Sequence, residues 1–225
     1  IYLACYLIFM EIHLKGAGEA LSIIFAITSI AVLALIVFIA AMLPHFQFYN
    51  LFNISTTSAA GANAFLPNGY IGIWAAVPFA IWFFLAVEGV PLAAEEAKEP
   101  QKSLPRGLIG AMLILTTFAL LILILGVGAA GEDTLKNSGA PLVDALITVY
   151  GKDSWLATFV NFVGLAGLIA SFFSIIYAYS RQFFALSRAG YLLTSLSLTT
   201  KNKAPYLAII IPGIVVFFLS FIKYC

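Results

Sequence analysis

The chain alternates between long apolar stretches and short groups of polar residues. Most apolar stretches reach about 20 residues, the length that an α-helix needs to cross the hydrocarbon core of a bilayer. Apolar and polar residues do not alternate at every second position, as they would in the strands of an outer-membrane barrel. The pattern therefore predicts an all-α transmembrane bundle, since helices satisfy their backbone hydrogen bonds internally.

Windows of about 20 residues give the approximate bounds of the spans. They predict one partial span and five complete ones in a single membrane domain, at about 1–14 (partial), 19–43, 71–96, 106–130, 154–180 and 205–223. The segment 141–150 is too short to cross and amphipathic at best, so we expect an interfacial helix there. Because the chain opens at Ile1 inside one apolar run and stops just after another, we interpret it as a fragment of a longer protein.

Composition narrows the class of protein. Hydrophobic residues make up 63% of the chain and charged residues 9%, which leaves too little polar surface for a soluble globule. The expected surroundings are therefore a lipid bilayer. The net charge of +1 and the lack of a basic cluster interleaved with aromatic residues exclude nucleic acid as a partner.

Basic residues predict the orientation of the spans. If the spans alternate, most Lys and Arg residues fall on one side, which the positive-inside rule makes cytoplasmic. We therefore expect a multi-pass protein of the plasma (inner) membrane. Loops 97–105 and 181–204 would be cytoplasmic and loop 44–70 external.

Glu88 is the one acidic residue deep inside a long apolar span. An ionised carboxylate in hydrocarbon costs about 2.5–3.5 kcal/mol even by the lower scales. Glu88 could hold a cationic group directly, could be ionised in one state and protonated in another, or could be a structural carboxyl. No Lys, Arg or His lies inside a visible span to pair with it, which favours a functional role.

The span that contains Glu88 is predicted to be discontinuous. Pro78 and Pro91 remove backbone donors, and Gly89 adds conformational freedom, so the segment from about Phe83 to Gly89 could unwind. Irregular backbone at membrane depth is tolerated where it lines a cavity, as in secondary transporters. A proline-kinked packing helix is the simpler alternative.

Two further groups of residues are candidates for ligand contacts. Trp82, Phe83 and Phe84 would bring aromatic faces to the break, suited to a cation or to a gate, although packing is almost as good an explanation for Trp82. Phe84 and Glu88 would share a helix face only if the turn between them stayed wound. In the span at 154–180, Ser171 and Ser174 continue a line of small residues that begins with Gly164 and Gly167. That line usually means close helix packing, but the hydroxyl groups could also contact a ligand or ion.

Nothing in the sequence indicates an enzyme. It contains no Ser, His and Asp set, no metal-ligand spacing and no glycine loop for phosphate. We expect no cofactor and no metal site.

Two motifs carry a family resemblance. Residues 79–89, followed by Ala94-Glu-Glu-Ala-Lys-Glu-Pro100 and Leu104-Pro105-Arg106-Gly, resemble the sixth span and following loop of the amino acid-polyamine-organocation (APC) superfamily. Residues 179–190, with Lys203-Ala204-Pro205 beyond them, resemble that superfamily's link from span eight to span nine. The wording around Trp82 to Lys98 is most similar to the ethanolamine permease branch.

The resemblance implies a partial inverted-repeat transporter fold of the leucine-transporter type, running from the end of span four to span nine. It implies that Trp82 gates the site from outside, and that Glu88 handles protons or cations. Backbone from Phe83 to Leu85 would line the pocket, with Ser171, Ser174 and Ile175 contributed by span eight. Many proton-coupled relatives have a Lys in span five near Thr28 and Ser29 of this chain, so the coupling ion, proton or sodium, stays open.

We therefore expect a secondary active transporter that imports ethanolamine or a similar small amino compound by alternating access. An amino acid permease or exchanger is the alternative within transport. A membrane sensor or a subunit that binds without transporting is the alternative from another class. Oligomeric state is open.

Overall fold

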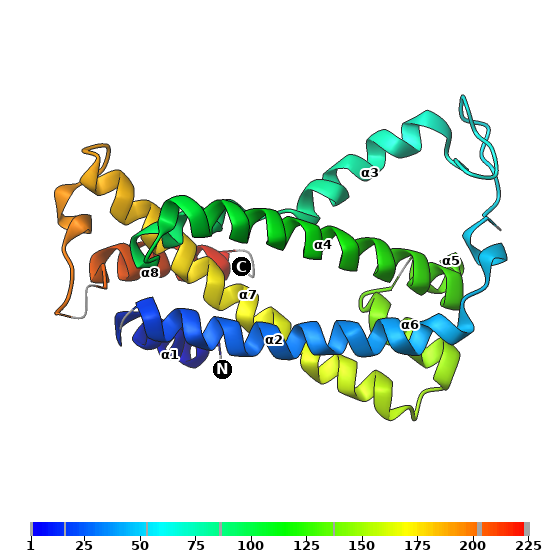
Figure 1. Cartoon of the computed structure of the whole chain (residues 1–225), viewed down its shortest axis with the longest axis horizontal. Coiled ribbons are helices and arrows are strands. Elements are labelled where there is room, and N and C mark those ends of the chain that lie inside the picture. Colours follow the sequence, from blue (N-terminus) through cyan, green and yellow to red (C-terminus); the bar gives the residue numbers. More distant parts are fainter. Residues whose placement is uncertain are drawn as a thin grey trace. The chain divides into compact units, whose positions relative to one another are not determined.

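The computed structural model describes residues 2–15, 17–52, 54–85, 87–136, 138–201 and 204–222, and these form helices joined by turns and loops (Figure 1). The α-helices are α1 (Tyr2–Lys15), α2 (Ala17–Met42), α3 (Gly69–Phe83), α4 (Pro100–Ala130), α5 (Glu132–Leu135), α6 (Pro141–Tyr150), α7 (Trp155–Arg188) and α8 (Tyr206–Ile222). Four 3-10 helices accompany them: η1 (Leu43–His45), η2 (Phe48–Leu51), η3 (Val87–Glu96) and η4 (Thr194–Ser197). This part of the chain contains no strand, so the protein is all-helical there.

Three helical segments are long and apolar enough to cross a membrane. They are Leu21–His45, Pro100–Ala130 and Trp155–Arg188, with window hydropathies of 3.0, 2.8 and 2.1. Gly69–Phe83, Pro141–Tyr150 and Tyr206–Leu219 are shorter apolar helices. Two long helices extend beyond the apolar pattern: α4 begins at Pro100 within the predicted loop 97–105, and α7 continues to Arg188 past the predicted end near 180. Polar residues continue a helix when their backbone hydrogen bonds can be made, so apolar runs underestimate helix length.

The chain forms two compact units, made of residues 1–29, 88–104 and 166–225 in one and 30–87 and 105–165 in the other. The second unit has an apolar core around α6. Its buried residues are Phe38, Met42, Leu125, Ala145, Leu146, Ala157 and Val160, which we call the α6 core. The segment predicted as an interfacial helix is therefore a helix with one packed face, through Ala145 and Leu146.

The loop after α2 is held to this unit by polar contacts. The Gln47 amide donates to the Gly128 carbonyl at 3.0 Å, and the Asn50 side chain donates to the same carbonyl at 2.9 Å. Gly69 has φ of +61° and starts α3 against the Ala60 carbonyl, where the Tyr70 amide donates at 3.2 Å. A Cβ at residue 69 would lie 2.3 Å from that carbonyl oxygen, so glycine is required there.

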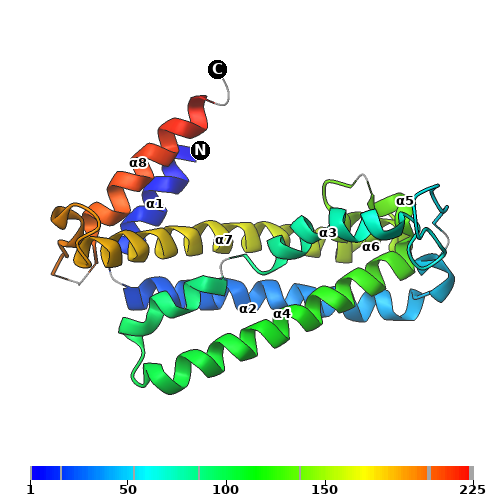
Figure 2. The ribbon, with the colours of Figure 1, turned by 90° about the horizontal axis from the view of Figure 1, so that it is seen from above.

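In the first unit, α1 and α8 lie side by side against α7 (Figure 2). The buried core residues are Met10, Ile176, Ala204 and Ile209. Phe9 of α1 packs on Phe172 and Phe173 of α7, with ring centroids 5.6 and 5.4 Å apart. The unit thus joins segments that are far apart in the sequence.

Candidate functional site

The apolar segment at 71–96 contains a change of helix type. The α-helix α3 ends at Phe83, and the following amides donate three residues back: Phe84 to Ile81 at 3.0 Å, and Leu85 to Trp82 at 3.3 Å. The Val87 amide donates to the Phe84 carbonyl at 3.4 Å, and the 3-10 helix η3 then runs to Glu96. The α-helix therefore ends inside the stretch for which we expected unwinding.

Proline chemistry gives a local reason for this break. In an α-helix the ring of Pro91 would clash with the carbonyl of residue 87, and its missing N–H would leave that carbonyl without a partner. Pro91 lies inside η3, where hydrogen bonds join residues three apart instead. A 3-10 helix of ten residues is longer than the usual three or four, and such stretches often mark a hinge.

The aromatic candidates surround the end of α3. Trp82 is 73% exposed, Phe83 44% and Leu85 55%, while Phe84 is half-buried. Because α3 ends at Phe83, the α-helical turn that would carry Phe84 and Glu88 onto one face is not formed. The Glu88 backbone belongs to η3, but its side chain lies outside the described part of the chain.

Ser171, Ser174 and Ile175 occupy one stretch of α7, at spacings that share a helix face. Ser171 and Ile175 are exposed, and Ser174 is half-buried. The Ser174 hydroxyl donates to the Ala170 carbonyl at 2.8 Å. With its proton used, that hydroxyl offers only lone pairs to a ligand.

The structure keeps the candidate residues in two groups. Trp82, Phe83, Phe84 and Leu85 belong to one compact unit and Ser171, Ser174 and Ile175 to the other. A single pocket lined by both groups stays a prediction.

Close packing along the line of small residues on α7 is not seen at Gly164. Within the described residues, a Cβ added at Gly164 would meet no atom within 4 Å. Packing therefore does not account for a small residue at that position.

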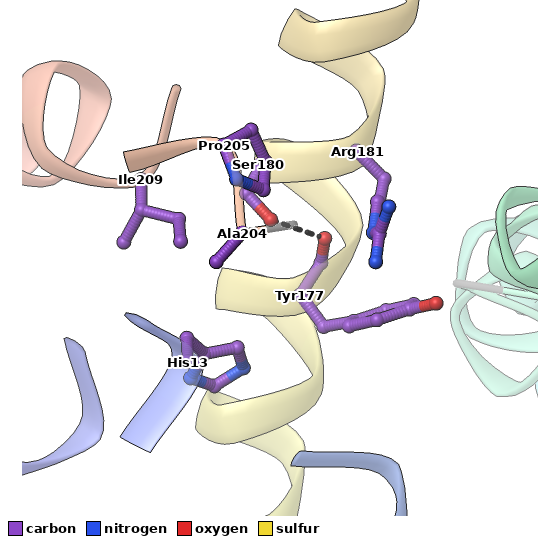
Figure 3. A pocket seen from close by; sticks show the side chains of 7 residues that line it. All are labelled: His13, Tyr177, Ser180, Arg181, Ala204, Pro205 and Ile209. Carbon is purple, nitrogen blue, oxygen red and sulfur yellow. Dashed lines mark hydrogen bonds between the residues drawn. The ribbon is translucent and has the colours of Figure 1, made fainter. Parts of the chain in front are cut away.

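A separate buried polar cluster joins α1 to α7 and to the segment before α8 (Figure 3). His13, Ser180 and Arg181 are all more than nine-tenths buried. Sequence reasoning placed His13 at a membrane edge and gave it no role. The available signal was that His13 and Arg181 each lie near the polar end of an apolar span.

A comparison with protein families identifies the chain. The family model described as "Amino acid permease" matches residues 1–224. The chain belongs to the amino acid permease family. This family is part of the APC superfamily.

Similar proteins include transporters of named substrates. The chain is 28% identical over 145 residues to a branched-chain amino acid permease of Bacillus subtilis, covering 64% of this chain and 31% of the relative. It is 28% identical over 182 residues to a D-serine/D-alanine/glycine transporter of Escherichia coli K12, covering 81% and 37%. An uncharacterized transporter of Rhizobium meliloti is 31% identical over 182 residues, covering 80% and 37%. The chain thus spans about a third of the length of these curated relatives.

For a member of this family, the positions Thr28 and Ser29 on α2 are informative. Both side chains are exposed, and the Ser29 hydroxyl donates to the Phe25 carbonyl at 2.7 Å. Hydroxyl groups stand here where many proton-coupled relatives are expected to place a lysine. These side chains bring no fixed positive charge to this part of α2.

Proposed function

We propose that this chain is part of a secondary transporter that imports a small compound with an ammonium group by alternating access, with ethanolamine as the first substrate to test. The observation that carries the proposal is the end of α3 at Phe83 within the apolar segment that contains Glu88. Helix breaks of this kind form binding sites in secondary transporters. Membership of the permease family supports the same class.

The chemistry of the break favours a cation. The carbonyl groups at the C-terminal end of a helix carry partial negative charge, and the last of them lack partners within the helix. In this proposal the ammonium group docks on the backbone from Phe83 to Leu85, in the field of Glu88. The exposed ring of Trp82 closes above it and adds a cation–π contact.

The α7 residues complete the proposed pocket. Ser174 has only acceptor capacity left, because its hydroxyl proton is bound to the Ala170 carbonyl. An acceptor suits an ammonium group and not a carboxylate. We place Ser171, Ser174 and Ile175 on the side of the substrate away from the break.

An amino acid is the second candidate substrate, and the relatives favour it. Two of them are named for branched-chain amino acids and for D-serine, D-alanine and glycine. An amino acid would need hydrogen-bond donors for its carboxylate in addition to the acceptors for its ammonium group. Competition of labelled ethanolamine uptake by a panel of amino acids separates the two: strong competition by neutral amino acids would favour the second candidate.

The test of the site is Glu88→Gln in the full-length protein. Loss of a charge-assisted hydrogen bond, worth about 1.5–3 kcal/mol, should lower ethanolamine uptake about 10- to 150-fold, with the protein still in the membrane. Glu99→Gln is the matched control, because Glu99 is an exposed carboxylate paired with Lys102 at 3.0 Å. Near-normal uptake and unchanged pH dependence in Glu88→Gln would contradict the role given to Glu88.

A further inference from the structure

A small cavity lies between α1, α7 and the start of α8, within one compact unit (Figure 3). Its polar lining consists of His13, Tyr177, Ser180 and Arg181, and its apolar lining of Ala204, Pro205 and Ile209. Its volume is about 10 Å³. His13 is 4% exposed, Ser180 3% and Arg181 8%, so the polar groups are taken out of contact with bulk solvent.

The hydrogen-bonding state of His13 follows from its contact within α1. Nδ1 lies 2.8 Å from the Phe9 carbonyl, which can only accept, so Nδ1 carries a hydrogen. In the neutral ring Nε2 is then an acceptor. Among the described residues Nε2 has no hydrogen-bond partner, although it is buried. A buried acceptor without a donor costs about 1–3 kcal/mol.

The neighbouring groups favour the neutral ring. The Arg181 guanidinium lies 5.5 Å from the centre of the Tyr177 ring and brings a fixed positive charge to the cavity. A protonated His13 would add a second positive charge in the same buried space. Phe173 packs on the imidazole with ring centroids 4.1 Å apart, which further excludes solvent.

Other polar groups of the lining can complete a hydration shell. The Ser180 hydroxyl donates to the Tyr177 carbonyl at 2.8 Å, which leaves its lone pairs as acceptors. Arg181 supplies N–H donors. A single molecule that both donates and accepts would fit this set.

Size identifies that molecule. A cavity needs roughly 10–15 Å³ of this kind of volume to hold one water, together with two to four polar partners. The cavity reaches the lower end of that range and offers three polar side chains besides Tyr177. A chloride ion or a substrate amine would need more space.

We propose that this cavity is a hydration site for one buried water, which donates a hydrogen bond to Nε2 of His13 and completes its bonding with Ser180 and Arg181. The water joins the end of α1 to α7 beneath the segment that leads into α8. It is separate from the break in the Glu88 segment, so this inference does not depend on the transported substrate.

Two measurements on the full-length protein test the site. A structure at a resolution that shows ordered waters should contain one water within hydrogen-bond distance of His13 Nε2. The variant His13→Phe keeps a ring against Phe173 and removes the acceptor, and should lower Tm by about 2 °C or more. His45→Phe is the matched control, since His45 is exposed and its ring contact with Tyr150, at 5.1 Å, is one that Phe preserves.

A dry cavity predicts the opposite sign. Replacing a buried unsatisfied nitrogen by an apolar ring of similar shape is neutral or stabilising. An unchanged or raised Tm in His13→Phe would overturn the proposal, and so would a cavity without density for water in the wild-type protein.

Discussion

The two packed regions of this chain are built from different materials. The α6 core is closed by seven buried apolar side chains, and its polar contacts lie at the edges, such as the Tyr150 hydroxyl that donates to the Ala41 carbonyl. The cluster around His13 buries a histidine, a serine and an arginine among Met10, Ile176 and Ile209. The difference indicates that shape determines the stability of the first region and polar satisfaction that of the second.

The largest effect is expected from a cavity in the α6 core. Leu146 is fully buried, so Leu146→Ala should destabilise the protein by about 2–5 kcal/mol, measured as a loss of thermal stability in detergent. Leu146→Met conserves volume and should cost less than about 1.5 kcal/mol. If shape is the determinant, these two variants differ widely, and equal losses would break the comparison. Leu113→Ala on the exposed face of α4 is the control, with an effect within about 0.5 kcal/mol.

An intermediate effect is expected from overpacking the same region. A Cβ at Gly128 would lie 2.4 Å from the ring of Phe46, and the Gly128 carbonyl accepts hydrogen bonds from Gln47 and Asn50. Gly128→Ala should therefore cost about 1–3 kcal/mol in unfolding measurements. Gly110→Ala on the same helix meets no described atom within 4 Å and should be neutral or stabilising. A neutral Gly128→Ala would show that the loop after α2 moves freely away from α4.

The smallest effect comes from one tyrosine hydroxyl in each region. Tyr179 donates to the Ile209 carbonyl at 3.1 Å, and Tyr150 donates to the Ala41 carbonyl at 2.7 Å. Removing either hydroxyl with Phe should cost about 0.5–1.5 kcal/mol. We expect Tyr179→Phe to lie at the upper end, because Tyr179 is half-buried and water replaces its hydroxyl less readily. A larger loss in Tyr150→Phe would reverse the assignment of polar dependence to the first unit.

Much of the fold follows from the sequence because apolar length and proline position act locally. The apolar runs predicted an all-helical membrane protein, and the motifs around Glu88 predicted the family, as the comparison with known families confirms. Pro91 and Gly89 indicated a weak point in the helix, and α3 ends at Phe83. Helix ends were less predictable, since α4 begins at Pro100 and α7 continues to Arg188 through polar residues.

Side-chain partners could not be obtained in this way. Ser174 was considered for its hydroxyl group, but the sequence does not reveal that the hydroxyl donates to Ala170, which changes the ligand it could bind. The relation of the Trp82 group to the Ser171 group stays a prediction, and so do the orientation in the membrane and the ethanolamine substrate.

By itself, then, the sequence determined the membrane class, the helical segments and the place where one helix fails, because each depends on the solvent preference and backbone chemistry of neighbouring residues. Only the tertiary structure decided that His13 meets Ser180 and Arg181 around a water-sized cavity, and that α6 buries Leu146. These contacts join residues from distant segments, and burial makes their unmet hydrogen bonds costly.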